Sequence, residues 1–192
     1  MIPEWLALTS DTLPVEARVR LLSAVWKAQR DSALDNADNV SNCTARIVAE
    51  ASRSGSNAIF AAMLSLGGMH APLIQAREVI FGTIPPPVLP GGVLVPGFGN
   101  SFHAGIDPNW VALADIIRNE YPTVWAPIEH WSALLKESGK PFAPNPAGLT
   151  AAVAELVGWP RGFEFLLLVM PRMTVWARLA ADTLAGVKPM LA

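Results

Sequence analysis

Apolar residues recur at helical spacing along most of this 192-residue chain, and this periodicity constrains the fold more than any other feature. Most of the periodic segments begin at a helix-compatible proline or an N-cap residue, and several end at glycine or proline. No long alternating pattern typical of a strand is found. The sequence therefore predicts an all-α protein with helices over 14–30, 56–66, 72–81, 108–119, 127–138, 146–157 and 162–185, the last kinked at Pro171.

The composition agrees with one folded unit. Hydrophobic residues make up 52% of the chain and charged residues only 16%, so a large core can be buried and disorder is excluded. The length suits a single domain over 1–192, which would divide, if at all, near 82–92. Residues 82–99 are rich in proline and glycine. They are either a linker between two helical halves or a loop whose uncovered backbone approaches a ligand.

Several classes of protein are disfavoured. A net charge of −2 argues against a nucleic-acid partner, and a lone Cys43 excludes a disulfide framework and a CxxC metal site. No pair of the three histidines has metal-ligand spacing, so no metal is expected. The N-terminus lacks a signal-peptide pattern, and the most apolar stretch, 163–171, falls far short of the ~20 residues that span a bilayer. We expect a cytoplasmic protein with no membrane contact.

His70 is the candidate for catalysis. It follows Gly67-Gly68-Met69 and precedes the expected helix at 72, whose positive N-terminal end favours a neutral imidazole. A neutral imidazole can donate a hydrogen bond to a developing oxyanion. The alternative is a loop histidine that caps a neighbouring helix. Asp107, directly before Pro108, is expected to cap the following helix rather than to do chemistry.

Four segments in order, within about residues 30–185, resemble citrate synthases. Residues 39–81 (NVSNCTARIVAEASRSGSNAIFAAMLSLGGMHAPLIQAREVIF) resemble the family's helix pair and histidine turn. VLVPGFGNSFHAGIDPNW (93–110) is similar to its V-x-G-[FY]-G-H stretch with the following D-P-R. NPAGLTAAVAELVG (145–158) and LLLVMPRMTVWARLA (166–180) are similar to the next two segments. The resemblance implies a truncated citrate synthase-like fold and a homodimer with helices at 44–66 and 72–81 in its interface.

The family condenses an acyl-CoA with a 2-oxo acid, and the resemblance assigns roles to individual positions. His70 matches the histidine that stabilises the enol, and Arg172 matches a carboxylate-binding arginine. Asn36 and Asn100 replace histidines, and Asn109 replaces an arginine. Ala147 stands where the family has its catalytic aspartate, and His103 could take over a lost role through a shifted turn. The implied substrate-binding residues are Asn36, Asn100, His103, Asn109 and Arg172.

The part of the family's site that binds acyl-CoA is matched better in this sequence than the part that binds the 2-oxo acid. The adenine and pantetheine of CoA lie, in that family, against the backbone of the V-x-G-[FY]-G loop. Its shape is kept here by Val95, Pro96, Gly97, Phe98 and Gly99. A CoA thioester is therefore implied as a substrate or ligand, and no covalently bound cofactor is expected.

Three functions stay open. The first is a diverged citrate synthase-like protein without ordinary activity, a pseudoenzyme that binds a CoA thioester or small metabolite, since a missing general base costs about 10²–10⁴ in rate. The second is an active acyl-CoA-dependent acyltransferase or lyase, or a thioester hydrolase, of altered specificity. The third is a non-catalytic structural or interaction module.

Overall fold

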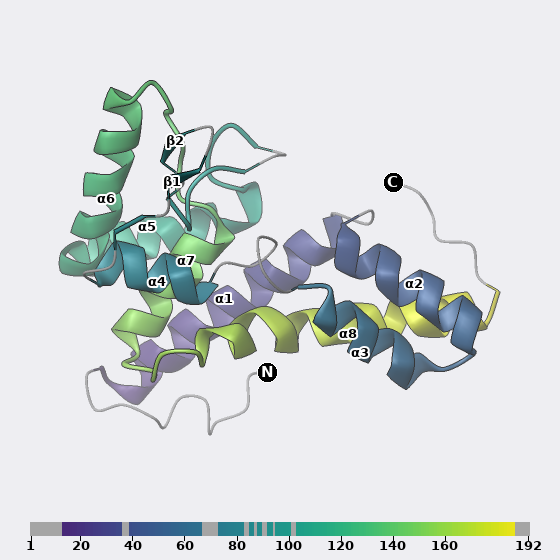
Figure 1. Cartoon of the computed structure of the whole chain (residues 1–192). Helices are drawn as coiled ribbons and strands as arrows, with labels where there is room; N and C mark the ends of the chain where they lie inside the picture. The colour runs from purple at the N-terminus through teal and green to yellow at the C-terminus, as the bar shows by residue number, and fades with distance from the viewer. Residues whose placement is uncertain are drawn as a thin grey trace. The chain divides into compact units, whose positions relative to one another are not determined.

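The computed structural model describes residues 13–35, 39–66, 73–82, 85–86, 88–89, 92–93, 95–100 and 103–186, and these are predominantly helical (Figure 1). The prediction of an all-α protein is confirmed. No helix in this part of the chain is long and apolar enough to cross a membrane. The elements are α1 (Val15–Asp35), α2 (Val40–Ser52), α3 (Gly55–Leu64), α4 (Leu73–Phe81), β1 (Val88–Leu89), β2 (Gly92–Val93), the 3₁₀ helix η3 (Pro108–Trp110), α5 (Val111–Glu120), α6 (Pro122–Glu137), α7 (Pro146–Leu156) and α8 (Glu164–Leu184).

Two helix boundaries differ from the predictions. Helix α6 begins at Pro122 rather than at residue 127, so Pro127 lies inside the helix. Proline lacks the N–H that would bond to the carbonyl of Thr123, but packing of Trp125 and Ile128 keeps the helix continuous across this gap. Helix α1 continues to Asp35, beyond the predicted end at residue 30. Both helices therefore extend beyond the boundaries that the local sequence signals predicted.

The helices form two compact units. Unit 1 comprises the described residues within Met1–Trp26 and Pro72–Leu167, and unit 2 those within Lys27–Ala71 and Leu168–Ala192. Helices α1 and α8 each contribute one part to each unit. The predicted single domain, with its optional boundary near 82–92, stays a prediction.

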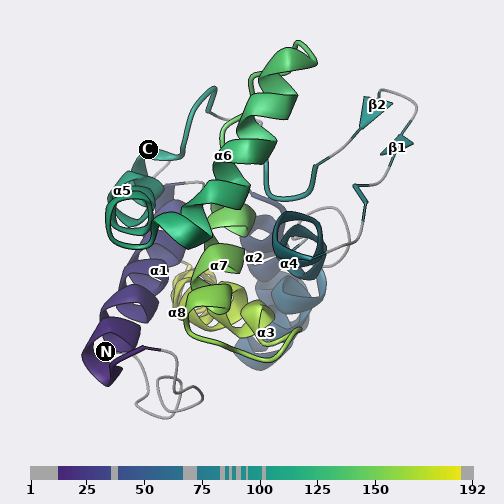
Figure 2. The same cartoon turned by 90° about the vertical axis from the view of Figure 1, so that its left-hand side faces the viewer.

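Unit 1 is built around α7. This helix packs against α4, α5 and α6, and Figure 2 shows it among them. Its residues from Ala147 to Ala154 are all buried and mostly small, so neighbouring backbones can approach closely. Asn145 caps the helix by accepting hydrogen bonds from the N–H groups of Ala147 and Gly148. A short, small-residue helix in the centre therefore fixes the spacing of its neighbours.

Unit 2 contains the hairpin of α2 and α3, which pack against one another. Asn39 and Ser54 cap the two helices with their side chains. Ala49 of α2 and Ala58 of α3 form a buried cluster with Ala180 of α8. Alanine contacts allow these three helices to lie close together, as α3 and α8 do in Figure 1.

A partly buried cluster of charges joins three helices of unit 1. Arg77 of α4 lies between Glu155 of α7, at 2.9 Å from Nε to Oε2, and Glu164 at the start of α8, at 3.7 Å from Nη1 to Oε2. Glu164 is 0% exposed, and neither of its oxygens has a hydrogen-bond partner in the described structure. The Arg77 guanidinium is therefore the charge that compensates this buried carboxylate.

We predict that Arg77→Met destabilises the protein by about 3–5 kcal/mol, because the Glu164 carboxylate is left buried without a cation. The double variant Arg77→Met/Glu164→Leu should recover most of that loss, and urea unfolding measures both. Arg178→Met, which breaks an exposed pair on α8, is the control and should leave the midpoint near that of the wild type. Equal losses in the single and double variants would show that Glu164 needs no compensating charge.

Candidate functional site

The loop at residues 95–99 is held tightly between two helices of unit 1. Gly97 has a φ of +93°, and a Cβ there would lie 2.9 Å from Ile80 Cδ1 and 3.0 Å from Gly148 Cα. A Cβ on Gly148 would lie 2.4 Å from the carbonyl oxygen of Gly97. Both positions therefore require glycine. The two glycines allow the backbone of the loop to lie directly against the backbone of α7. Contact of the loop with a ligand stays a prediction.

The backbone of this loop is further paired with the segment before α7. The N–H of Gly99 donates to the carbonyl of Ala143 at 2.9 Å, and the N–H of Asn145 donates to the carbonyl of Gly97 at 2.9 Å. The side-chain amide of Asn145 donates to the carbonyl of Gly99 at 2.8 Å. Phe98 forms an isolated bridge with Pro144. These bonds fix the loop, with Val95, Pro96, Gly97 and Phe98 buried and Gly99 half-buried.

The first turn of α7 carries no acid. Ala147, the position that the resemblance gives to the catalytic aspartate, is buried in this turn. Asn145 lies two residues before it, but both ends of its amide are bonded to backbone groups of the loop and the helix. Neither side chain can accept a proton from a carbon acid. This turn therefore holds the loop in place and contains no general base.

The other candidates of unit 1 lie on the segment that follows the loop. Asn100 and His103 are half-buried. Asp107 is buried and accepts a hydrogen bond from the N–H of Asn109 at 2.9 Å, so its predicted role as the cap of η3 is confirmed. This cap fixes the backbone of Asn109 at the start of η3.

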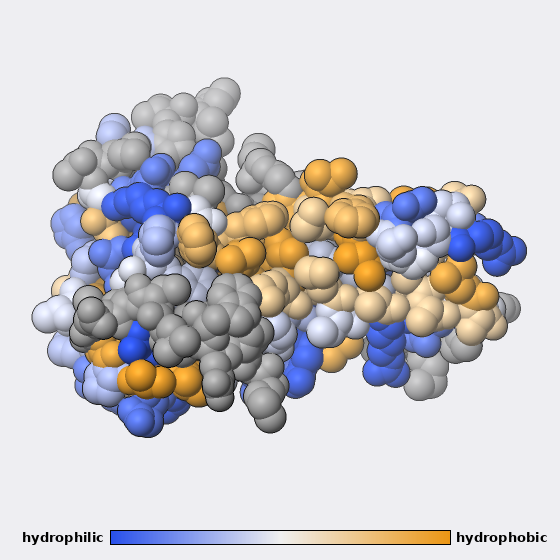
Figure 3. Space-filling view, turned by 90° about the horizontal axis from the view of Figure 1, so that it is seen from below, coloured by the Kyte–Doolittle hydropathy of each residue, from blue (hydrophilic) through white to orange (hydrophobic). Residues whose placement is uncertain are grey.

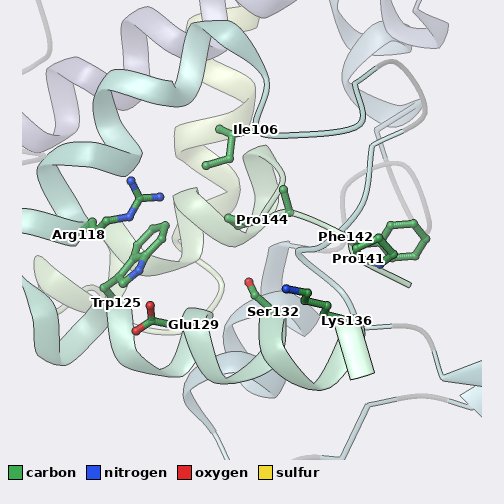
Figure 4. A pocket seen from close by; sticks show the side chains of 10 residues that line it. Ile106, Arg118, Trp125, Glu129, Ser132, Lys136, Pro141, Phe142 and Pro144 are labelled. Carbon is green, nitrogen blue, oxygen red and sulfur yellow. The ribbon is translucent and has the colours of Figure 1, made fainter. Parts of the chain in front are cut away.

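A pocket of about 360 Å³ opens beside the segment that pairs with the loop (Figure 4). One face of α6 lines it with Trp125, Glu129, Ser132 and Lys136, and Pro141–Pro144 lie opposite. Arg118 of α5 stacks over the Trp125 ring at 4.6 Å. The volume is in the range of small-molecule sites. The pocket brings two cations, one carboxylate and an indole next to the segment that pairs with the loop.

Arg172 belongs to unit 2, on α8. Its Nε donates to Oε1 of Gln29, on the part of α1 in the same unit, at 3.3 Å. Among the described residues it forms no ion pair with a carboxylate, and burial lowers the pKa of Arg172 to about 10. The guanidinium is still charged at neutral pH, in surroundings that penalise the charge. Arg172 is thus a partly buried cation with a neutral partner.

Two of the predicted site residues, Asn36 and His70, lie outside the described residues. Sequence reasoning in turn missed Gln29, the partner of Arg172, and the structural role of Asn145. The sequence did contain a signal for Gln29. At helical spacing, Gln29 lies on the same face of α1 as the apolar residues Leu22 and Val25, and it is the one amide side chain of that helix. Within the described ranges no group of three or more His, Cys, Asp or Glu side chains could hold a metal ion.

The helix order and the loop packed on α7 define an all-α fold of the citrate synthase-like type. The solved structure of citryl-CoA lyase from Hydrogenobacter thermophilus is similar over 94% of this chain and 75% of that protein, with a TM-score of 0.73 and 21% identity. Neither a protein-family model nor a curated protein sequence matches the chain. The likeness therefore establishes the fold.

We predict that Gly148→Ala destabilises the protein by about 1–3 kcal/mol, because the new Cβ overlaps the Gly97 carbonyl and separates loop from helix. Gly55→Ala is the matched control: nothing lies within 4 Å of its Cβ position at the start of α3, so its stability should be unchanged or slightly raised. Denaturant unfolding compares the two. Equal effects of both substitutions would contradict the close approach.

Proposed function

We propose that this chain is a diverged citrate synthase-like protein that binds a CoA thioester or another small metabolite and lacks ordinary citrate synthase activity. The observation that carries the proposal is the first turn of α7. It has the methyl group of Ala147 at the position that the resemblance gives to the general base, and the nearby Asn145 amide is committed to backbone hydrogen bonds.

Loss of this base is enough to suppress the condensation. Positioned acid–base groups contribute about 10²–10⁴ in rate, and a methyl group supplies none of this. The alternative residues nearby are amides, which do not take up a proton at neutral pH. An acyl-CoA bound here would keep the proton on its α-carbon.

The loop and its neighbouring pocket support binding of CoA. The loop at 95–99 keeps its shape through the Gly97–Gly148 contact and through hydrogen bonds to Ala143 and Asn145. Beside it, Lys136 and Arg118 bring positive charge to the 360 Å³ pocket, and Trp125 adds an aromatic surface. Phosphates and an adenine ring are recognised by these kinds of group. A bound CoA therefore has partners in unit 1.

Calorimetric titration with CoA and an assay of acetyl-CoA with oxaloacetate test the proposal together. We expect CoA to bind, no citrate to form, and Lys136→Gln to weaken CoA binding about tenfold through loss of a charge-assisted hydrogen bond. Arg161→Gln, an exposed cation of unit 1 outside the pocket, is the control and should bind CoA as the wild type does.

Citrate formation at an enzymatic rate would refute the loss of activity. Consumption of acetyl-CoA without citrate, abolished by His70→Ala, would favour an acyltransferase, lyase or thioester hydrolase of altered specificity. Absence of binding by CoA or any tested acid would favour a structural module.

We further propose that the chain forms a homodimer through the α2–α3 hairpin. Large apolar side chains are exposed on both helices of the hairpin, and Figure 3 shows apolar residues (orange) on the face that it draws. A second copy would cover these residues in an isologous interface. By contrast, the described apolar residues of α4 are mostly buried within the chain, so the hairpin is the better candidate. The exposed residues are Val40, Ile47, Phe60 and Leu64.

Leu64→Asp is expected to convert the dimer into a monomer, because Leu64 is 78% exposed and a buried carboxylate in the interface would lack a partner. Sedimentation velocity measures the change. The matched control is Leu134→Asp, at a leucine of α6 that is 40% exposed and belongs to unit 1. A monomeric wild-type protein, or a dimer that survives Leu64→Asp, would contradict the proposed interface.

A further inference from the structure

The pocket on α6 contains two charged side chains that have no partner in the chain. Glu129 and Lys136 both line it, and neither side chain forms a hydrogen bond or an ion pair with a described residue. The third charged residue of the pocket, Arg118, donates to Asp115 of its own helix at 2.9 Å and stacks over Trp125. The charge of Arg118 is therefore balanced, which leaves Glu129 and Lys136 as the free charges of the pocket.

These two charges have opposite signs and lie at different ends of the pocket. They are seven residues apart on α6, which is about two helical turns and a separation of roughly 10 Å between their Cα atoms. In Figure 4, Glu129 lies at the Trp125 end of the pocket and Lys136 at the Phe142 end. A ligand that pairs with both residues must therefore carry a cation and an anion that are themselves separated.

The region between the two charges offers one acceptor and an apolar wall. The hydroxyl of Ser132 donates to the carbonyl of Ile128 at 2.9 Å, so its oxygen can only accept a hydrogen bond from a ligand. Opposite α6, the pocket is lined by Pro141–Pro144, a segment of two prolines, a phenylalanine and an alanine. The volume of about 360 Å³ leaves room for an apolar body between the charges.

We infer that this pocket binds a zwitterion whose ammonium and carboxylate groups stand at opposite ends of an apolar body. The ammonium group is bound by Glu129 and Ser132, and the carboxylate by Lys136. A ligand with one charge would pair with one end of the pocket and leave the other end unpaired. The inference goes beyond the proposed function and does not require CoA to bind, although CoA would compete for Lys136.

The experiment follows the indole N–H resonance of Trp125 in the ¹⁵N-labelled 192-residue protein, assigned by its absence in Trp125→Phe. The probe is 4-(aminomethyl)benzoate, which carries its two charges at opposite ends of a ring, and we expect it to shift the resonance in a saturable way. Three compounds of similar size are the comparison: 4-methylbenzoate lacks the ammonium group, benzylamine lacks the carboxylate, and phenylalanine carries both at one end. Each should bind at least about tenfold more weakly, because each loses a charge-assisted hydrogen bond.

Variants of the two free charges test the orientation of the probe. Glu129→Gln and Lys136→Gln should each weaken its binding about tenfold and leave the melting temperature unchanged, because both residues are exposed. The exchange variant Glu129→Lys/Lys136→Glu should bind the probe better than either single variant, since a zwitterion can bind in the reverse direction. Glu137→Gln is the control: it removes an exposed carboxylate of α6 that does not line the pocket, and it should bind the probe as the wild type does.

Three results would overturn the inference: a singly charged compound that binds as tightly as the probe, phenylalanine that does so, or an exchange variant that binds the probe more weakly than both single variants. These outcomes are independent of CoA. A protein that binds the probe but no CoA would refute CoA binding alone. A protein that binds CoA but not the probe would refute this inference alone.

Discussion

The contact between the backbones of Gly97 and Gly148 is the constraint on which the rest of unit 1 depends. Because neither residue has a Cβ, the loop at 95–99 lies directly on α7, and the first turn of that helix faces the loop. Asn145 then joins loop and helix. Its backbone N–H and its side-chain NH₂ group donate to carbonyls of the loop, and its side-chain oxygen accepts from the N–H of Ala147. A side chain with this many structural partners is not available for chemistry.

Charge is used differently in the two units. In unit 1 the buried Arg77 is balanced by Glu155 and Glu164, so the cation is part of the framework. In unit 2 the partly buried Arg172 has the amide of Gln29 as its partner, and the Nε2 of that amide has no hydrogen-bond partner in the described structure. The first arrangement is complete within the chain.

Periodicity was sufficient to predict most of the fold. The helix at 146–157 and the cap at Asp107 could be predicted because their signals are local. The start of α6 could not be predicted, because proline is typical of a first helical turn and Pro127 was therefore taken as the start. Only the packing of Trp125 shows that the helix begins more than a turn earlier. The pairing of Gln29 with Arg172 joins positions 143 residues apart, and no spacing rule encodes such a contact. The lone amide on the apolar stripe of α1 was the one available indication.

The course of α1 and α8 through both units has a practical consequence. Each unit is assembled from two separate stretches of the polypeptide, so cleavage of the chain at one position cannot release either unit with its complete core. A fragment ending at Trp26 or starting at Leu168 would carry half a helix and expose the apolar side that its missing half should continue. Isolating one unit would instead require a permuted gene that fuses its two stretches through a new connection.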